Sequence, residues 1–240
     1  MRDSSGQTVP MKIIAHIESL FPEKFGIPRQ AGIVDTPARI VFEPQYRVAE
    51  AVRGIEGFDY LWLVWLFSEA QREDWSPTVR PPRLGGNERV GVFASRSPFR
   101  PNPVGLSSVR LTGVEMTTDS GPVLHVAGAD LMDGTPILDI KPYLPYTDSH
   151  PDARSGFAPQ AAERLLDVDI PQSIIVRIPL GERQPLVDIL AHDPRPQYHD
   201  DPERVYGMKF GRYDVRFRVR DHRVEVVEVC RINSATGCRG

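Results

Sequence analysis

Hydrophobic and polar positions alternate along several short segments of the chain, which is the pattern of a half-buried β-strand. The clearest segment is 213–220, where Tyr213 and every second residue after it are apolar and the positions between them are charged. Residues 60–67 are instead apolar throughout, which predicts a strand buried on both faces. The same reasoning predicts further strands at residues 11–19, 39–42, 91–94, 106–116, 122–129, 173–178 and 224–229.

Helical patterns are rare, and we predict helices only at residues 49–55 and 185–192. The chain has 23 prolines in 240 residues, about twice the usual share of this residue. Because an interior proline costs a helix about 3 kcal/mol, this composition argues against an all-helical protein. Short strands without amphipathic helices between them predict a mainly β (β-rich α+β) fold, built on an antiparallel β-barrel or sandwich.

Residues 147–160 are polar, contain turn formers and show no periodicity, so we predict a domain boundary there. The predicted domains are residues 11–150, which form the barrel, and residues 151–232, which form a small C-terminal α+β domain. We expect residues 1–10 and 233–240 to be flexible tails.

No apolar run reaches the roughly 20 residues needed to cross a bilayer. The N-terminal sequence lacks the apolar core and cleavage site of a secretory signal. The two cysteines, Cys230 and Cys238, lie near the C-terminus, where they cannot hold the body of the fold together. We therefore expect a cytoplasmic protein without a membrane span.

The net charge of −3 does not suggest a general nucleic-acid binder, but the charges are unevenly distributed. Residues 80–110 hold six arginines and one acid, Glu88, and residues 212–223 form a second basic stretch. Arginine exceeds lysine by 25 to 4 along the chain. Two explanations remain open: a genome rich in arginine codons, or forked donors that bind phosphates or carboxylates.

The common catalytic motifs are absent. The sequence contains no glycine-rich dinucleotide fingerprint, no phosphate-binding P-loop and no nucleophile elbow. The six histidines are isolated from one another, so we expect no metal site.

Residues 76–107 place arginines among prolines and glycines. The segment Arg100-Pro101-Asn102-Pro103 is nearly incapable of forming a helix, because each proline restricts the residue before it. Arg100 and Asn102 are therefore held on a stiff loop, which can present donors to a ligand at low entropic cost. The alternative is that these arginines only cap strand ends or pair with acids.

Three acids, Asp130, Asp133 and Asp139, lie within ten residues, around a Gly-Thr-Pro turn. One of them could accept hydrogen bonds from a ribose or an amino group. The alternative is a turn in which Asp130 and Asp133 bond the backbone, while Lys141 neutralises an acid.

Four sequence segments resemble one known family, and their order and spacing along the chain also match that family. They are EKFGIPRQAGIV, AVRGIEGFDYLW, WSPTVRPPRLGGNERVGVFASRSPFRPNPVG and DLMDGTPILDIKPYLPY, which begin at residues 23, 51, 75 and 130. On them the chain is identified as similar to the TsaA-like family, whose bacterial members of this length are the TrmO-type tRNA N6-methyltransferases. The resemblance covers residues 11–229 and is thin at 157–182.

The resemblance implies a β-barrel that binds S-adenosylmethionine outside the Rossmann fold, a small C-terminal domain and a homodimer. The implied substrate is an adenosine of tRNA, beside the anticodon, that already carries a threonylcarbamoyl group on N6. The implied donor-binding residues are Pro28, Arg29, Gln30, Phe67, Ser68, Arg96, Leu106, Asp130, Leu131, Met132 and Asp133.

Methyl transfer is an in-line displacement, so the site needs alignment of the reactants and an acceptor for the N6 proton. Arg100 suits the threonyl carboxylate of the substrate, and Asp130, Asp133 and Asn102 are candidates for the acceptor. The predicted catalytic residues are Arg100, Asn102 and Asp133. The predicted substrate-binding residues are Arg83, Arg100, Lys141, Tyr143, Arg216 and Arg218.

For the phosphates of tRNA we expect contacts from arginines 80–89 and from the basic face of residues 213–220. The alternative for that face is a solvated sheet surface. Two other functions remain open: a regulator that binds S-adenosylmethionine or RNA without catalysis, and a methyltransferase with another acceptor. The C-terminal part, with HDPRPQY at residues 192–198 and the basic hairpin, favours tRNA.

Overall fold

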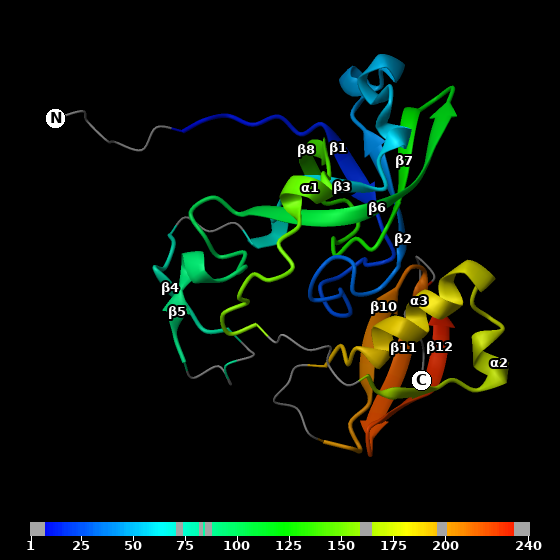
Figure 1. Ribbon diagram of the computed structural model, residues 1–240. Helices are drawn as coiled ribbons and strands as arrows, with labels where there is room; N and C mark the ends of the chain where they lie inside the picture. The colour runs from blue at the N-terminus through cyan, green and yellow to red at the C-terminus, as the bar shows by residue number, and fades with distance from the viewer. Residues whose placement is uncertain are drawn as a thin grey trace.

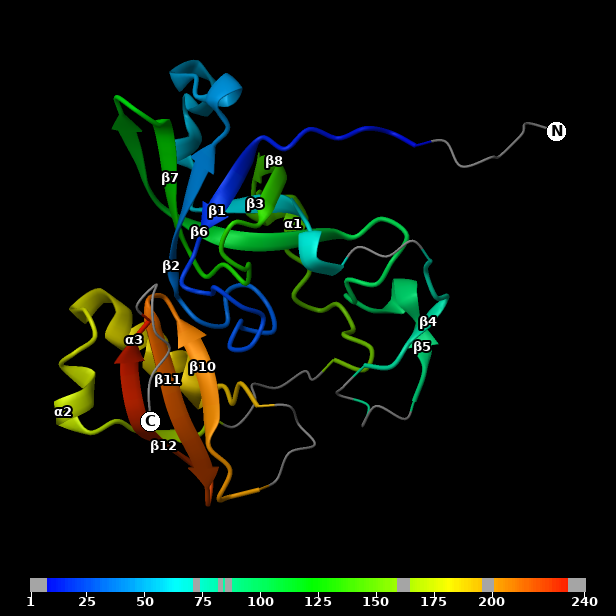
Figure 2. The ribbon, with the colours of Figure 1, turned by 180° about the vertical axis from the view of Figure 1, so that it is seen from behind.

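The structure is a computed structural model that describes residues 8–70, 74–81, 84, 88–158, 165–195 and 201–232. Figures 1 and 2 show a barrel above a smaller sheet, with an irregular lobe to one side. This lobe is built around two short strands, β4 (Thr78–Val79) and β5 (Val90–Gly91). The barrel is closed, in the strand order β1-β2-β7-β6-β3-β8, and all neighbouring strands are antiparallel. The predicted mainly β fold, with a barrel and a small C-terminal α+β unit, is confirmed.

Five of the six barrel strands overlap segments that the sequence predicted, and the sixth, at residues 136–142, was not predicted. They are β1 (Ala15–Glu18), β2 (Pro37–Phe42), β3 (Tyr60–Leu66), β6 (Val104–Thr117), β7 (Gly121–Ala127) and β8 (Pro136–Pro142). In β3 the buried residues alternate, at Leu61, Leu63 and Trp65, because successive side chains point to opposite faces. The prediction that this strand is buried on both faces is wrong, since its other face is only partly covered.

Short 3-10 turns replace two predicted elements in the first half of the chain. The helix predicted at 49–55 is two turns, η2 (Ala49–Val52) and η3 (Ile55–Gly57), separated by Gly54 in a left-handed conformation. The strand predicted at 91–94 is β5 (Val90–Gly91), paired with β4 (Thr78–Val79) and followed by η6 (Val92–Ala94). The remaining short elements are η1 (Pro44–Tyr46), η4 (Ser68–Ala70) and α1 (Pro145–Asp148).

The C-terminal part is a four-stranded sheet with helices on one side (Figures 1 and 2). Its sheet has the order β10-β11-β12-β9. Its elements are β9 (Asp167–Asp169), α2 (Gln172–Ile175), α3 (Leu180–Ala191), β10 (Tyr206–Phe210), β11 (Tyr213–Arg220) and β12 (Arg223–Arg231). The strand predicted at 173–178 is wrong, because α2 begins after Pro171 and the amide of Ile174 donates to the Pro171 carbonyl.

Two hydrophobic cores underlie this arrangement. One fills the barrel, and the other lies between the small sheet and α3. The second core also contains Phe21 and Val34, which come from the loop between β1 and β2 and are both buried. Thus a segment of the barrel's own chain completes the core of the C-terminal sheet.

Between α1 and β9 the structure describes residues 149–158 and 165–166, which form neither helix nor strand. Within the described ranges no helix is long and apolar enough to cross a membrane. Cys230 is half-buried in β12, and Cys238 lies outside the described residues.

Candidate functional site

A cavity of about 650 Å³ lies where β3 and β6 meet the lobe, and this size is typical of a small-molecule site. Five segments of the chain contribute to it. The lining residues are Pro28, Arg29, Gln30, Trp62, Trp65, Phe67, Phe93, Arg96, Arg100, Pro101, Asn102, Val104, Gly105, Leu106 and Asp130. Residues that are far apart in the sequence therefore face one hollow.

The pairing of β3 with β6 shapes one wall. Trp65 lies opposite Gly105 in the register of the two strands. A side chain at position 105 would overlap the indole ring of Trp65, so glycine lets this ring lie across β6. The indole Nε1 of Trp65 thereby reaches Ser107 Oγ, to which it donates at 3.0 Å.

A buried carboxyl group lies at the end of this hydrogen-bond chain. The Ser107 hydroxyl donates in turn to Asp130 Oδ1 at 2.6 Å. Burial raises the pKa of Asp130 above its ordinary value, and the bond from Ser107 and the charge of Arg96 oppose this rise only in part. Asp130 is thus a carboxyl group at the cavity wall whose charge is poorly solvated.

The arginines of the lobe are oriented by backbone and side-chain acceptors. Arg96 Nη1 donates to Gln30 Oε1, which joins the lobe to the β1–β2 loop across the cavity. Arg100 Nη1 donates to the Ser95 carbonyl at 3.2 Å. Each guanidinium has further N–H groups, so these bonds leave donors that can face a ligand.

The stiff segment predicted around Asn102 is pinned to the end of β3. The amide of Phe67 donates to the Pro103 carbonyl at 2.8 Å, and the amide of Val104 donates to the Asn102 carbonyl at 2.7 Å. Arg100 and Asn102 therefore enter the cavity wall from a fixed backbone.

A second hollow of about 250 Å³ adjoins the first and shares Trp65, Phe67 and Asp130 with it. Ser68 and Met132, two of the predicted donor-binding residues, line this second hollow. Asp130 thus lies between the two spaces.

Asp133 and Leu131 line neither hollow, and Asp133 bonds the backbone, as the alternative interpretation of this turn expected. The Oδ1 atom of Asp133 accepts from the amide of Ser19 at 2.9 Å. Leu131 is buried in the barrel core, and its carbonyl accepts from Ser19 Oγ. Both residues instead hold the beginning of the β1–β2 loop.

Tyr143 does not line the cavity but packs against a residue that does. Its ring lies 5.6 Å from that of Trp62, which lines the cavity and donates from Nε1 to Asp148 Oδ2 at 2.8 Å. Lys141 forms an ion pair of 2.8 Å with Asp139, which raises the pKa of the lysine. The neutralising role considered for Lys141 is therefore present.

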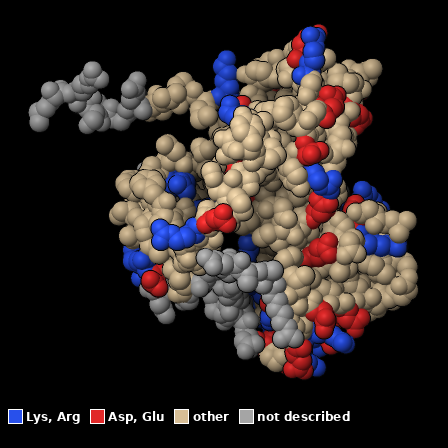
Figure 3. All heavy atoms as spheres, viewed as in Figure 1, with Lys and Arg blue, Asp and Glu red and all other residues tan. Residues whose placement is uncertain are grey.

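Arg216 and Arg218 lie far along the chain, on the outer face of β11. Arg216 is within 3.6 Å of the carboxylates of both Asp214 and Glu228, and Arg218 lies opposite Glu225 in the sheet register. Figure 3 shows charges of both signs intermingled at the bottom of the molecule, where this sheet lies. Neither arginine lines the cavity, and Arg83 lies outside the described residues.

Sequence reasoning missed Trp62, Trp65, Phe93 and Ser107. The aromatic residues of β3 were visible only as part of an apolar strand, and the partner of Ser107 lies 23 residues away. Among the residues whose placement is described, no group of histidines, cysteines or acids could hold a metal ion.

Comparison with known proteins gives consistent results along the chain. The family model for the tRNA-methyltransferase O N-terminal domain matches residues 16–149, and that for the TrmO C-terminal domain matches residues 163–232. The tRNA (adenine(37)-N6)-methyltransferase of Escherichia coli K12 is 42% identical over 222 residues, which cover 89% of this chain and 94% of that protein.

Two proteins of Pseudomonas aeruginosa extend this similarity. The putative S-adenosylmethionine-dependent methyltransferase RcsF is 40% identical over 90% of this chain and 95% of its own length. The crystal structure of TrmO from this organism superposes with a TM-score of 0.76 at 33% identity, over 95% of this chain and 100% of that one. This chain belongs to the tRNA-methyltransferase O (TrmO) family.

Proposed function

We propose that this protein is an S-adenosylmethionine-dependent methyltransferase that methylates N6 of adenine 37 in tRNA, in the nucleoside that carries an N6-threonylcarbamoyl group. The observation that carries the proposal is the similarity, over almost the whole chain, to the E. coli enzyme of that name. The name of the P. aeruginosa relative includes the same methyl donor.

The residues of the cavity fit S-adenosylmethionine. Trp65, Phe67 and Leu106 offer apolar surface for an adenine ring. Asp130 is an acceptor for a ribose hydroxyl or an amino group, and Arg29 and Arg96 suit a carboxylate. The cavity lining as a whole contains seven of the eleven donor-binding residues that the family resemblance implied.

Bound S-adenosylmethionine would supply the methyl group: as the N6 nitrogen attacks the methyl carbon in line, the carbon–sulfur bond would break and S-adenosylhomocysteine would leave. Arg100 holds the threonyl carboxylate of the substrate with its forked donors. Asn102 bonds an edge of the displaced base. Of the acidic candidates, Asp130 suits the role of proton acceptor better than Asp133, because it lines the cavity and its raised pKa makes it the stronger base.

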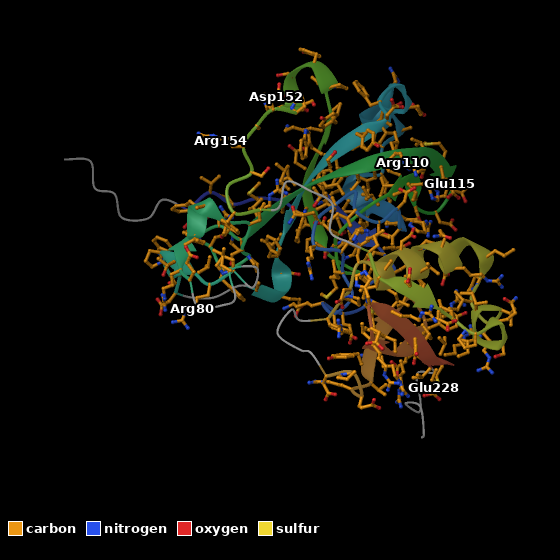
Figure 4. The ribbon with its side chains drawn as sticks, turned by 60° about the horizontal axis from the view of Figure 1, so that its bottom comes forward. Arg80, Arg110, Glu115, Asp152, Arg154 and Glu228 are labelled. Atoms are coloured by element: carbon orange, nitrogen blue, oxygen red, sulfur yellow. The ribbon has the colours of Figure 1, made fainter. Side chains whose placement is uncertain are left out.

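The arginines of the lobe are the preferred contacts for the phosphates of tRNA. Figure 4 shows Arg80 on the outer side of this lobe, far from Glu228 on the small sheet. Arg89, directly before β5, donates to Thr78 Oγ1 in β4 at 2.8 Å. Arg216 and Arg218 remain proposed contacts of second rank, because the acids around them compete with phosphate.

The protein acts as a homodimer in the cytoplasm under this proposal. Large apolar side chains at the rim of the cavity support the dimer, since Phe93 is 72% exposed and Leu106 57% exposed.

Mass spectrometry of nucleosides tests the activity directly. tRNA with and without the threonylcarbamoyl group is incubated with the purified protein and S-adenosylmethionine. We expect one added methyl on the modified adenosine and none on the unmodified one. A protein that binds the donor but methylates neither tRNA would instead be a non-catalytic binder.

Arg100→Ala is the informative variant in this assay. Loss of a charge-assisted pair costs about 1.5–3 kcal/mol, which predicts a fall of about 10- to 150-fold in kcat/KM. Arg154→Ala, a change at an exposed position, is the matched control. Near-normal activity of Arg100→Ala would remove this residue from the site.

A further inference from the structure

The loop between β1 and β2, residues 19–36, is attached to the barrel near both of its ends. The amide of Asp133 donates to the Phe21 carbonyl at 2.8 Å, and the amide of Ser19 donates to the Asp133 carboxylate. Near the other end, the amide of Gly32 donates to the Gly128 carbonyl at 2.8 Å. The middle of the loop, which carries three cavity residues, depends on other contacts.

Two of these contacts come from outside the C-terminal part: Arg96 donates to Gln30, and the Lys24 ammonium group donates to the Glu69 carbonyl at 3.1 Å. The others come from the C-terminal sheet and α3. The amide of Gly211 donates to the Leu20 carbonyl at 2.7 Å. Glu23 accepts from the amide of Lys209 at 3.2 Å and forms an ion pair of 3.1 Å with its ammonium group. Together with the burial of Phe21 and Val34 in the C-terminal core, these bonds seat the loop on β10 and its neighbours.

Gly26 makes the tightest of these contacts. Its φ of +95° is a conformation that side chains rarely adopt. A Cβ atom there would overlap Sδ and Cγ of Met208, which is itself buried in β10. Only glycine therefore allows the loop to lie this close to the sheet.

The cavity residues follow Gly26 directly. Pro28, Arg29 and Gln30 line the cavity from the next turn of the loop. Arg29 Nη2 lies 3.5 Å from the carbonyl oxygen of Asp193, at the end of α3. The carboxylate of Asp193 is held in turn by two bonds of 2.8 Å from Arg195. A shift of the loop away from the C-terminal sheet would move all three cavity residues.

We infer that the C-terminal sheet and α3 position residues 28–30 for the methyl donor, so that Gly26, Glu23 and Met208 are positioning residues for donor binding. The C-terminal part thus contributes to the donor site in addition to any contact with tRNA. This inference rests on the proposed function, because it requires S-adenosylmethionine to occupy the cavity.

Gly26→Ala tests the inference through donor binding alone, measured by equilibrium dialysis of the full chain with labelled S-adenosylmethionine. We expect the Kd to rise at least about tenfold. The control is Gly54→Ala, because Gly54 has a similar φ of +85° but open space around its Cα. This control should bind the donor within about twofold of the unaltered protein, since twofold corresponds to only a few tenths of a kcal/mol.

A kinetic measurement separates positioning from general damage to the fold. For Gly26→Ala we expect the KM for S-adenosylmethionine to rise in parallel with the Kd, while the KM for tRNA stays within about twofold. An equal rise of both KM values would indicate a structural defect and would overturn the inference.

Glu23→Ala keeps the test decisive if Gly26→Ala does not fold. It removes an ion pair at the surface, for which a loss of up to about 1 kcal/mol predicts a two- to fivefold rise in the donor Kd. Its control is Glu50→Ala, which removes the exposed pair between Glu50 of η2 and Arg53, the residue after that turn. Equal donor affinities in Glu23→Ala and Glu50→Ala, or in Gly26→Ala and Gly54→Ala, would overturn the inference and leave the proposed function intact. An unaltered protein that binds no S-adenosylmethionine would overturn both.

Discussion

At the scale of single residues, the raised pKa of Asp130 affects both its proposed role as proton acceptor and the stability of the fold. Burial raises its pKa, so the folded chain holds this proton more tightly than the unfolded chain. The resulting stability is fully present below the unfolded pKa and is lost as the pH rises through the folded pKa. Ionisation of Asp130 therefore destabilises the fold relative to the protonated form.

Asp130→Asn should separate these two effects. A neutral amide can still accept from Ser107, so we expect the Tm at pH 8 to rise, by about 2–4 °C for each kcal/mol gained. At pH 4 the rise should be smaller, because the carboxyl is then more protonated. Methyl transfer should fall by at least about 100-fold, as expected for a lost proton acceptor.

Scanning calorimetry at both pH values, with an activity assay, checks this prediction. Asp152→Asn is the control, because Asp152 is an exposed carboxylate on the surface (Figure 4). An equal drop in Tm at both pH values would mean that the bond from Ser107, and not the burial of charge, dominates at this site.

Residue identities predicted only part of the cavity. The sequence stretches that carry the family resemblance contain four residues that line the cavity together: Arg96, Arg100, Asn102 and Asp130. The place of Trp65 in the cavity wall was not predicted, because it depends on the register of β3 and β6 that sets Trp65 opposite Gly105. Register is a property of two strands, and one residue's neighbours in the sequence do not reveal it.

At the scale of elements, the lobe and β11 differ in how readily their arginines can bind the phosphates of tRNA. Phosphate must displace Asp214 and Glu228 before it can bind Arg216. We expect Arg216→Ala to change tRNA affinity by less than about fivefold, since exposed pairs contribute about 0–1 kcal/mol. Arg80→Ala and Arg89→Ala should weaken binding more and should each lower the salt slope by about one.

Filter binding at several salt concentrations measures both quantities. The comparison is internal, since all three variants remove one arginine. A larger loss in Arg216→Ala than in Arg80→Ala would instead place the main phosphate contact on the small sheet.

The elements themselves were predictable where a pattern is regular. The strict alternation from Tyr213 onward predicted β11 correctly, because one face packs on a core and the other does not. The β-branched run Ile174-Ile175-Val176 is typical of a strand, and the strand predicted from it is wrong. It forms α2 because Ile174 and Ile175 pack on the C-terminal core in that conformation, and such tertiary contacts override local preference.

At the scale of the whole molecule, we predict a dimer that covers the rim of the cavity. Sedimentation equilibrium should give about twice the chain mass of 26.9 kDa. Phe93→Ser should shift the protein toward the monomer, because burial of a phenylalanine contributes about 1.5–3 kcal/mol. Tyr146→Ser is the control, since Tyr146 is 86% exposed outside this rim. A monomeric unaltered protein would contradict the prediction.

The seating of Phe21 and Val34 in the C-terminal core has a consequence for protein engineering. A chimera that exchanges only the segment from β9 to β12 between two relatives would join a foreign sheet to the native loop, and the two surfaces would not match. The exchangeable module is therefore discontinuous: it consists of residues 19–36 together with the segment from β9 to β12. Relatives recombined along this boundary should keep both cores intact.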